Sequence, residues 1–65
     1  MKLEVTISMD NAAFYANNGE TFAPNFEVAR ILREYAQQVA DMEHMETKLR
    51  DINGNIVGDA RVVED

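Results

Sequence analysis

The chain contains no cysteine and no tryptophan, and only one proline and three glycines among its 65 residues. Without cysteine it can form no disulfide bond, no thiolate zinc site and no cysteine nucleophile. It also has no run of about 18 apolar residues, which a membrane-spanning helix requires. A smaller unit would bury too little apolar surface to fold, so we expect one domain over residues 1–65.

Acidic side chains outnumber basic ones, 12 against 6, which gives a formal net charge of −6 at pH 7. This charge repels nucleic-acid phosphates and disfavours non-specific binding to DNA or RNA. Mimicry of a phosphate row is disfavoured as well, because acids and bases are interleaved and no three acids are consecutive. We interpret the charge mainly as solubilising. The first residues lack the apolar stretch of a signal peptide, which predicts a cytoplasmic protein.

The first predicted element is a strand over residues 2–9. Its polar and apolar side chains alternate strictly, and the apolar ones are Leu3, Val5, Ile7 and Met9. A period of two with β-branched residues is typical of a strand that has one buried and one solvated face.

A long loop is predicted over residues 10–24, because this stretch follows no hydrophobic period. It contains the turn formers Asn17-Asn18-Gly19, of which the glycine can adopt a positive φ. Loops of this length in small domains are often functional. A helical turn over residues 10–16, capped by Asp10 or Asn11, is an alternative for the first part of the loop.

Between Pro24 and Met42 the apolar residues recur at intervals of three and four, which predicts an amphipathic helix. The apolar stripe consists of Val28, Ile31, Leu32, Tyr35, Ala36, Val39 and Met42. Pro24 or Asn25 suits the start of the helix, and Glu27 complements the positive end of the helix dipole.

The dipeptide Asn53-Gly54 lies between two runs that contain apolar residues, at positions 47–52 and 56–63. This arrangement predicts a β-hairpin with a two-residue type I′ turn, in which both central residues have a positive φ. The turn then sets the pairing register of the two strands.

In this register Leu49 pairs with Gly58. Arg50 then pairs with Val57, which lies on the side of the sheet away from the helix. The side that should meet the helix holds Leu49, Ile56, Gly58, Ala60 and Val62. Asp51 falls on the same side, but near the turn, where we expect its carboxylate to reach water.

The predicted fold is α+β: a three-stranded antiparallel sheet with one amphipathic helix across one face. The element order is β-α-β-β, and a right-handed crossover from the first strand to the second gives the spatial order 1-3-2. The apolar core of such a short chain supplies little net stability. A homodimer or a higher homo-oligomer is therefore an alternative to a monomer.

The run Asp51-Ile52-Asn53-Gly54-Asn55 matches the first three ligand positions of a calcium-binding EF-hand loop. The match then ends, because glycine falls at loop position four rather than six and position twelve is Val62, which has no carboxylate. We interpret this run as a structural turn and expect no metal site.

His44 is the only histidine of the chain, and histidine is the most frequent general base in enzymes. Catalysis would also need a nucleophile and an oxyanion site, and the sequence has no motif for either. The glycines stand isolated at positions 19, 54 and 58, so no glycine-rich phosphate loop exists. The sequence therefore predicts a non-enzymatic protein without a cofactor. It leaves open a nucleotide held between the subunits of an oligomer.

Aromatic side chains are concentrated in the predicted loop and at the start of the helix, at Phe14, Tyr15, Phe22 and Phe26. They either cover the end of the small core or remain exposed as anchors for a partner, since aromatic residues dominate interface hot spots. Tyr15 suits an anchor best, because its hydroxyl tolerates water. The methionine-containing stretch 42–45 is a second candidate surface. Our candidate partner-binding residues are Phe14, Tyr15, Phe22, Asp41, Glu43 and Glu46.

Three segments, Met9–Phe14, Glu27–Arg33 and Leu49–Gly58, together resemble a group of short phage and prophage proteins. The resemblance spans most of the chain and transfers no assigned activity or site residue. It implies a bacterial host cell, and a protein that occupies a surface of a bacterial host or defence protein as an inhibitor or accessory factor. The alternative function is a self-assembling homo-oligomer that forms a scaffold or sequesters a nucleotide-type signal between its subunits.

Overall fold

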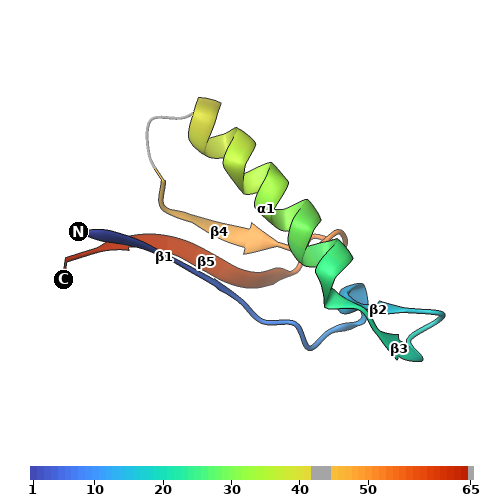
Figure 1. Ribbon diagram of the computed structural model, residues 1–65. Coiled ribbons are helices and arrows are strands. Elements are labelled where there is room, and N and C mark those ends of the chain that lie inside the picture. The colour runs from blue at the N-terminus through green and yellow to red at the C-terminus, as the bar shows by residue number, and fades with distance from the viewer. Residues whose placement is uncertain (42–44, 65) are drawn as a thin grey trace.

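The computed structural model describes residues 1–41 and 45–64. It shows an α+β fold in which one α-helix lies over a three-stranded antiparallel sheet (Figure 1). The predicted class, helix and three-stranded antiparallel sheet are therefore confirmed. The predicted β-α-β-β element order is incomplete, because two short strands that form a separate sheet lie between the first strand and the helix.

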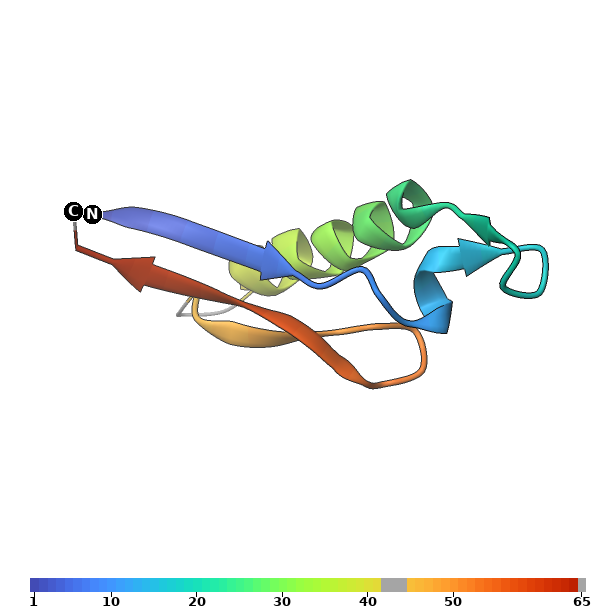
Figure 2. The same ribbon diagram turned by 90° about the horizontal axis from the view of Figure 1, so that it is seen from below.

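The larger sheet consists of β1 (Lys2–Ile7), β4 (Thr47–Arg50) and β5 (Ile56–Val63), and β5 lies in the centre. β1 is antiparallel to β5 along its whole length, with Lys2 opposite Val63. The two ends of the chain therefore lie close together, at one end of the molecule (Figure 2).

Helix α1 (Pro24–Asp41) begins at Pro24, the first of the two predicted starts, because a proline in the first turn leaves no backbone hydrogen bond unmade. The residues of the predicted stripe that are buried or half-buried are Val28, Ile31, Tyr35 and Val39. Leu32 and Ala36 are exposed instead. The helix rises away from the sheet toward its C-terminal end (Figure 1), so the sheet covers only part of the stripe. Met42 lies outside the described residues.

The core is a cluster of buried residues from the segment before β2, the helix and two strands of the larger sheet: Phe14, Ile31, Tyr35, Leu49, Val57 and Ala60. Its largest fully buried side chain is Phe14, which closes the short 3-10 helix η1 (Ala12–Phe14). The N-cap of η1 is Asn11, whose side chain accepts a hydrogen bond from the backbone N–H of Ala13 at 3.0 Å. The predicted helical turn is thus present in shorter form, and its cap is Asn11.

The second sheet is a small hairpin of β2 (Tyr15–Ala16) and β3 (Thr21–Phe22). Its turn bends through Asn17 and Asn18, with φ of 55° and 58°, a conformation that asparagine tolerates better than most residues. The prediction of an irregular loop over residues 10–24 is therefore wrong for this part. Two-residue strands are too short to show a period of two in the sequence.

The hairpin of β4 and β5 differs from the predicted register. Leu49 pairs with Gly58, as predicted, but Arg50 pairs with Ile56 rather than with Val57. β5 therefore carries one extra residue, a β-bulge, which changes the side of the sheet to which a residue points. As a result Val57 is buried in the core and Ile56 is exposed, the reverse of the prediction.

The turn of this hairpin is also not of type I′. The N–H of Gly54 donates to the carbonyl of Asp51, and the N–H of Asp51 donates to the carbonyl of Asn55, at 3.0 and 2.9 Å. Gly54 has a φ of 87°, whereas Asn53 is not among the residues with positive φ. The loop between Asp51 and Asn55 therefore has three residues, and its left-handed glycine is typical of loops of this length.

The molecule is elongated, with extents of 39 × 25 × 17 Å. Its radius of gyration is 12.9 Å, against roughly 11 Å for a compact chain of this length. The small β2–β3 hairpin projects at the end opposite the two termini (Figure 2). No helical segment among the described residues combines the length and the apolarity that crossing a membrane requires.

Candidate functional site

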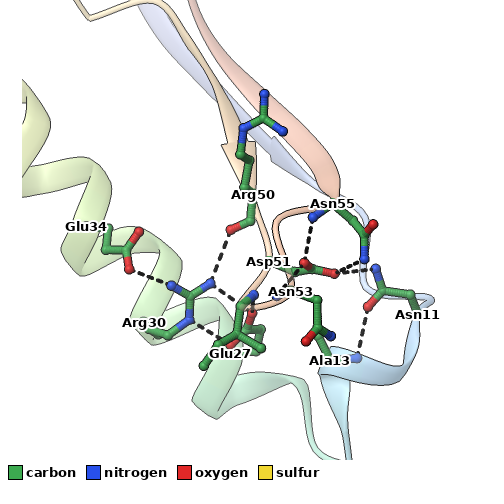
Figure 3. A network of polar contacts seen from close by, with 10 residues as sticks. Asn11, Ala13, Glu27, Arg30, Glu34, Arg50, Asp51, Asn53 and Asn55 are labelled. Carbon is green, nitrogen blue, oxygen red and sulfur yellow. Dashed lines mark hydrogen bonds and ion pairs between the residues drawn. The ribbon is translucent and has the colours of Figure 1, made fainter.

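Two carboxylates are buried, although neither was a candidate site residue in the sequence. Glu27 is 6% exposed and Asp51 is 4% exposed. Both belong to a polar network that joins η1, α1 and the β4–β5 turn (Figure 3). Within residues 1–41 and 45–64, no three histidine, aspartate or glutamate side chains are placed to share a metal ion.

Asp51 organises the turn between β4 and β5. Its carboxylate accepts hydrogen bonds from the backbone N–H groups of Asn53 and Asn55, both at 2.9 Å. The side-chain amides of Asn55 and Asn11 also donate to it, at 3.1 and 2.8 Å (Figure 3). The expectation that this carboxylate reaches water is therefore wrong. The residues that resemble the start of a calcium loop bind one another instead.

The pKa of Asp51 reflects this environment. Burial by itself raises the pKa of a carboxyl group, because it penalises the charged form. The hydrogen bonds from Asn55, Asn11 and Asn53 outweigh that effect and hold the pKa of Asp51 below its ordinary value. Asp51 is therefore ionised at neutral pH and is held by donors from two separate parts of the chain.

Glu27 links the helix to the same turn. Arg30 donates to it from Nε and Nη2, both at 2.9 Å, and the backbone N–H of Ile52 donates to it at 2.8 Å. The hydrogen bonds from Arg30, followed by the bond from Ile52, lower the pKa of Glu27 despite its burial. The pKa of Arg30 is raised in turn, chiefly by its hydrogen bond with Glu27. The network is a structural joint between helix and hairpin.

Sequence reasoning assigned Glu27 only to the helix dipole, because its contact with Ile52 joins residues 25 positions apart. Such a contact leaves no local pattern in the sequence. All buried side-chain nitrogen and oxygen atoms of the described residues have a hydrogen-bond partner. The network therefore explains rigidity rather than chemistry.

The aromatic residues of the predicted loop separate into buried and exposed ones. Phe14 is fully buried, at 0% exposure, so it covers the core and does not present a surface to a partner. Tyr15 and Phe22 lie opposite each other on β2 and β3, and their ring centroids are 5.2 Å apart. Phe22 is 53% exposed, and Phe26, on the first turn of α1, is 75% exposed. We call Tyr15, Phe22 and Phe26 the aromatic surface.

The hairpin that carries this surface is anchored at its base. The N–H of Ala23 donates to the carbonyl of Phe14 at 2.9 Å, so the residue after β3 is bonded to the residue before β2. Because the Phe14 side chain fills the core, this bond connects the projecting hairpin directly to the folded interior. In the turn, the Asn17 side chain donates to Thr21 Oγ1 at 3.1 Å.

The acidic candidates do not join the aromatic surface. Asp41 lies at the C-terminal end of α1, whereas the aromatic surface lies beside its N-terminal end (Figure 1). Asp41 accepts a hydrogen bond from the side chain of Gln37 at 2.8 Å. Glu46 accepts one from the backbone N–H of Val62 at 3.0 Å, which ties it to β5. Glu43 lies outside the described residues.

A groove of about 350 Å³ lies between α1 and the edge strand β4. Its lining combines apolar and charged side chains, including Ile31, Tyr35, Leu49, Glu34, Lys48 and Arg50. Glu34 is already paired with Arg30 in this region. The mixture of charge signs selects no particular ligand.

The edge strand β1 of the larger sheet exposes two apolar side chains. Leu3 and Val5 on β1 are exposed, although the strand pattern predicted that they are buried. They lie opposite Val62 and Ala60 of β5, but only Ile7, at the far end of the strand, packs against the core. The helix therefore leaves part of the apolar side of the sheet uncovered.

The fold and these surfaces define a small α+β domain with a projecting aromatic hairpin and an apolar sheet edge. Comparison of the chain with protein-family models, curated proteins and solved structures gives no significant match.

Proposed function

We propose that this protein is a small non-enzymatic binding protein that occupies a surface of another protein through its aromatic surface. The observation that carries the proposal is the position of three exposed rings, Tyr15, Phe22 and Phe26, at one end of an elongated molecule. Aromatic side chains contribute large contact areas at low entropic cost and are the most frequent hot-spot residues.

The structure of the hairpin supports a recognition role because its rings need little rearrangement. Tyr15 and Phe22 are already paired in the free chain, and the hydrogen bond between Ala23 and Phe14 holds the hairpin base. A preformed surface binds more tightly than a mobile one, because less conformational entropy is lost on association.

The resemblance to phage and prophage proteins directs the choice of partner to a bacterial host or defence protein. In this proposal the chain acts in the bacterial cytoplasm as an inhibitor or accessory factor by covering a surface that the partner needs. The net charge of −6 keeps such a protein soluble and favours its association with a basic partner surface.

The test is capture of a partner from a bacterial lysate by the immobilised protein, followed by affinity measurement with the purified partner. Truncation of a central aromatic anchor costs about 2 kcal/mol or more, so Phe22→Ala should weaken the affinity by roughly 30-fold. Tyr15→Ala should also weaken it, while both variants keep the circular dichroism spectrum of the folded chain.

Ile56→Ala is the matched control, because Ile56 is a similarly exposed apolar residue at 55% exposure and belongs to a different element. Its affinity for the partner should be unchanged. A partner that binds the Tyr15, Phe22 and Phe26 variants as tightly as the unmodified chain would remove the aromatic surface from the proposal.

A further inference from the structure

The outer side of β1 is an open sheet edge. β5 pairs with one side of β1, and none of the helices and strands that the structure describes lies along the other side (Figure 2). The strand also exposes the apolar side chains of Leu3 and Val5. An open edge of this composition is a template for another strand.

The hydrogen-bonding direction of β1 follows from one contact at its end. The N–H of Ser8 donates to the carbonyl of Val57, beside β5, at 2.7 Å. Backbone groups of successive strand residues point in alternate directions, so the even-numbered residues of β1 face β5. The N–H and C=O groups of Leu3 and Val5 therefore point outward, toward an additional strand.

A second copy of the chain can pair with this edge in an antiparallel direction. A two-fold axis at Leu3 places Leu3 opposite Leu3 of the second copy, and Lys2 of each copy opposite Glu4 of the other. Opposite charges placed directly across two strands attract. The edge is therefore complementary to itself in this register.

Other registers that satisfy the outward backbone groups lack this complementarity. An axis between Leu3 and Val5 places Glu4 opposite Glu4, and like charges in that position repel. An axis at Val5 places Glu4 opposite Thr6 and forms no charge pair. The charges of β1 thus select the axis at Leu3.

The polar side of the sheet already carries opposite charges at the junctions between its strands. The Nζ atom of Lys48 on β4 lies 4.0 Å from Oδ2 of Asp59 on β5. The Nε atom of Arg61 on β5 lies 3.6 Å from Oε1 of Glu4 on β1. The pairs between Lys2 and Glu4 continue this row across the edge into a second copy.

We propose that two copies of this chain associate through their β1 edges, around a two-fold axis at Leu3. Each copy contributes three strands to one continuous antiparallel sheet, and both helices lie on the same side of it. The exposed Leu3 side chains of the two copies then meet at the centre of the assembly, and Val5 of each copy lies opposite Met1 of the other. This inference does not depend on the aromatic surface, which lies at the opposite end of the molecule (Figure 2).

Sedimentation velocity of the full chain across a micromolar concentration range tests the interface. The unmodified chain should form a dimer. Lys2→Glu and Glu4→Lys each turn two attractive pairs into repulsive ones and should each weaken dimerisation by about 10-fold. The double variant Lys2→Glu/Glu4→Lys restores both attractive pairs and should dimerise like the unmodified chain. An equimolar mixture of the two single variants should do the same.

Lys48→Glu is the matched control, because Lys48 is an exposed lysine on the opposite edge strand, and it should leave dimerisation unchanged. Leu3→Pro is the second variant, because it removes an outward N–H at the axis and leaves the bonds between β1 and β5 intact. It should give a monomer with the same circular dichroism spectrum. A monomeric unmodified chain, or single-charge variants that the double variant does not rescue, would overturn the proposal.

Discussion

The carboxylate of Glu27 accepts a hydrogen bond from the backbone N–H of Ile52 at 2.8 Å. The first turn of α1 therefore holds the turn between β4 and β5. Ile52 lies outside both strands, so the carboxylate of Glu27 takes the place of a strand partner for its N–H. The geometry of the hairpin thus depends on a helix residue that lies far from it in the sequence.

We expect Glu27→Ala to lower the free energy of unfolding by about 2 kcal/mol or more, because it leaves Arg30 and the Ile52 N–H without a buried partner. Glu34→Ala is the matched control, since it breaks only the exposed ion pair with the same arginine; its effect should stay within about 0.5 kcal/mol. Urea denaturation measures both. Equal losses for the two variants would contradict the special role of Glu27.

The stability of the protein should fall in acid. Hydrogen bonds hold the pKa values of Glu27 and Asp51 below their ordinary values of 4.5 and 3.8. The unfolded chain therefore takes up protons at these groups before the folded chain does. Their stabilising contribution is complete above the ordinary values and is lost as the pH falls through the lower folded-state values.

Melting temperatures measured from pH 7 to pH 3 check this sign. The unmodified chain should show its main loss below about pH 4.5. Glu27→Gln should be less stable at pH 7 and lose less on acidification, because the linked carboxyl group is absent. Glu20→Gln changes an exposed carboxyl and should keep the profile of the unmodified chain. A Glu27→Gln profile parallel to that of the unmodified chain would refute the linkage.

Gly58→Ala should be the most damaging glycine substitution. A Cβ atom at Gly58 would overlap the backbone carbonyl of Thr6, so β1 and β5 would have to separate where they pair. We expect a loss of about 3 kcal/mol, at the upper end for overpacking. At Gly19 an added Cβ atom would meet open space, and only the positive φ of the backbone would be strained. Gly19→Ala should therefore lower the stability by about 1 kcal/mol. Thermal unfolding of the two variants separates these cases, and comparable stability would show that the strands adjust.

Phe14→Ala and Phe22→Ala should differ in their loss of stability, because one removes a core ring and the other a surface ring. Phe14 is fully buried, so its truncation should cost about 4 kcal/mol, as is usual for a core phenylalanine. Phe22 is half-exposed, and its loss should cost less than about 1 kcal/mol, mainly through its contact with Tyr15. Denaturation curves for both variants provide the measurement. A strong destabilisation by Phe22→Ala would assign the ring pair to folding rather than to recognition.

Hydrophobic periodicity was sufficient to predict the first strand and the helix. The alternation at Leu3, Val5 and Ile7 predicted β1, and the three-and-four spacing after Pro24 predicted α1. Periodicity could not say how far the helix covers the sheet. That depends on the angle between them, and so Leu3, Val5 and Leu32 are exposed although the pattern predicted an apolar contact.

The loop length and the strand register near the β4–β5 turn could not be predicted from the sequence, for a different reason. The signal Asn53-Gly54 correctly placed a hairpin but did not distinguish a two-residue loop from a three-residue loop with a bulge. That difference of one residue exchanged the sides of the sheet to which Val57 and Ile56 point, so that Val57 is buried and Ile56 is exposed. It also buried Asp51, whose partner Asn11 comes from the other end of the chain. Among the candidate site residues, Tyr15 and Phe22 are brought together by the pairing of β2 with β3, which the sequence did not predict.

The pairing of Lys2 with Val63 has a consequence for the synthesis of the protein. β1 is synthesised well before its partner β5, and β5 is also the strand with which β4 pairs in the sheet. The helix and the aromatic hairpin can form while the chain is still growing, whereas the sheet cannot. Leu3 and Val5 therefore have no partner strand within the fold until β5 has been synthesised. The pairing of β1 with β5 then closes a long loop that contains the helix and the aromatic hairpin.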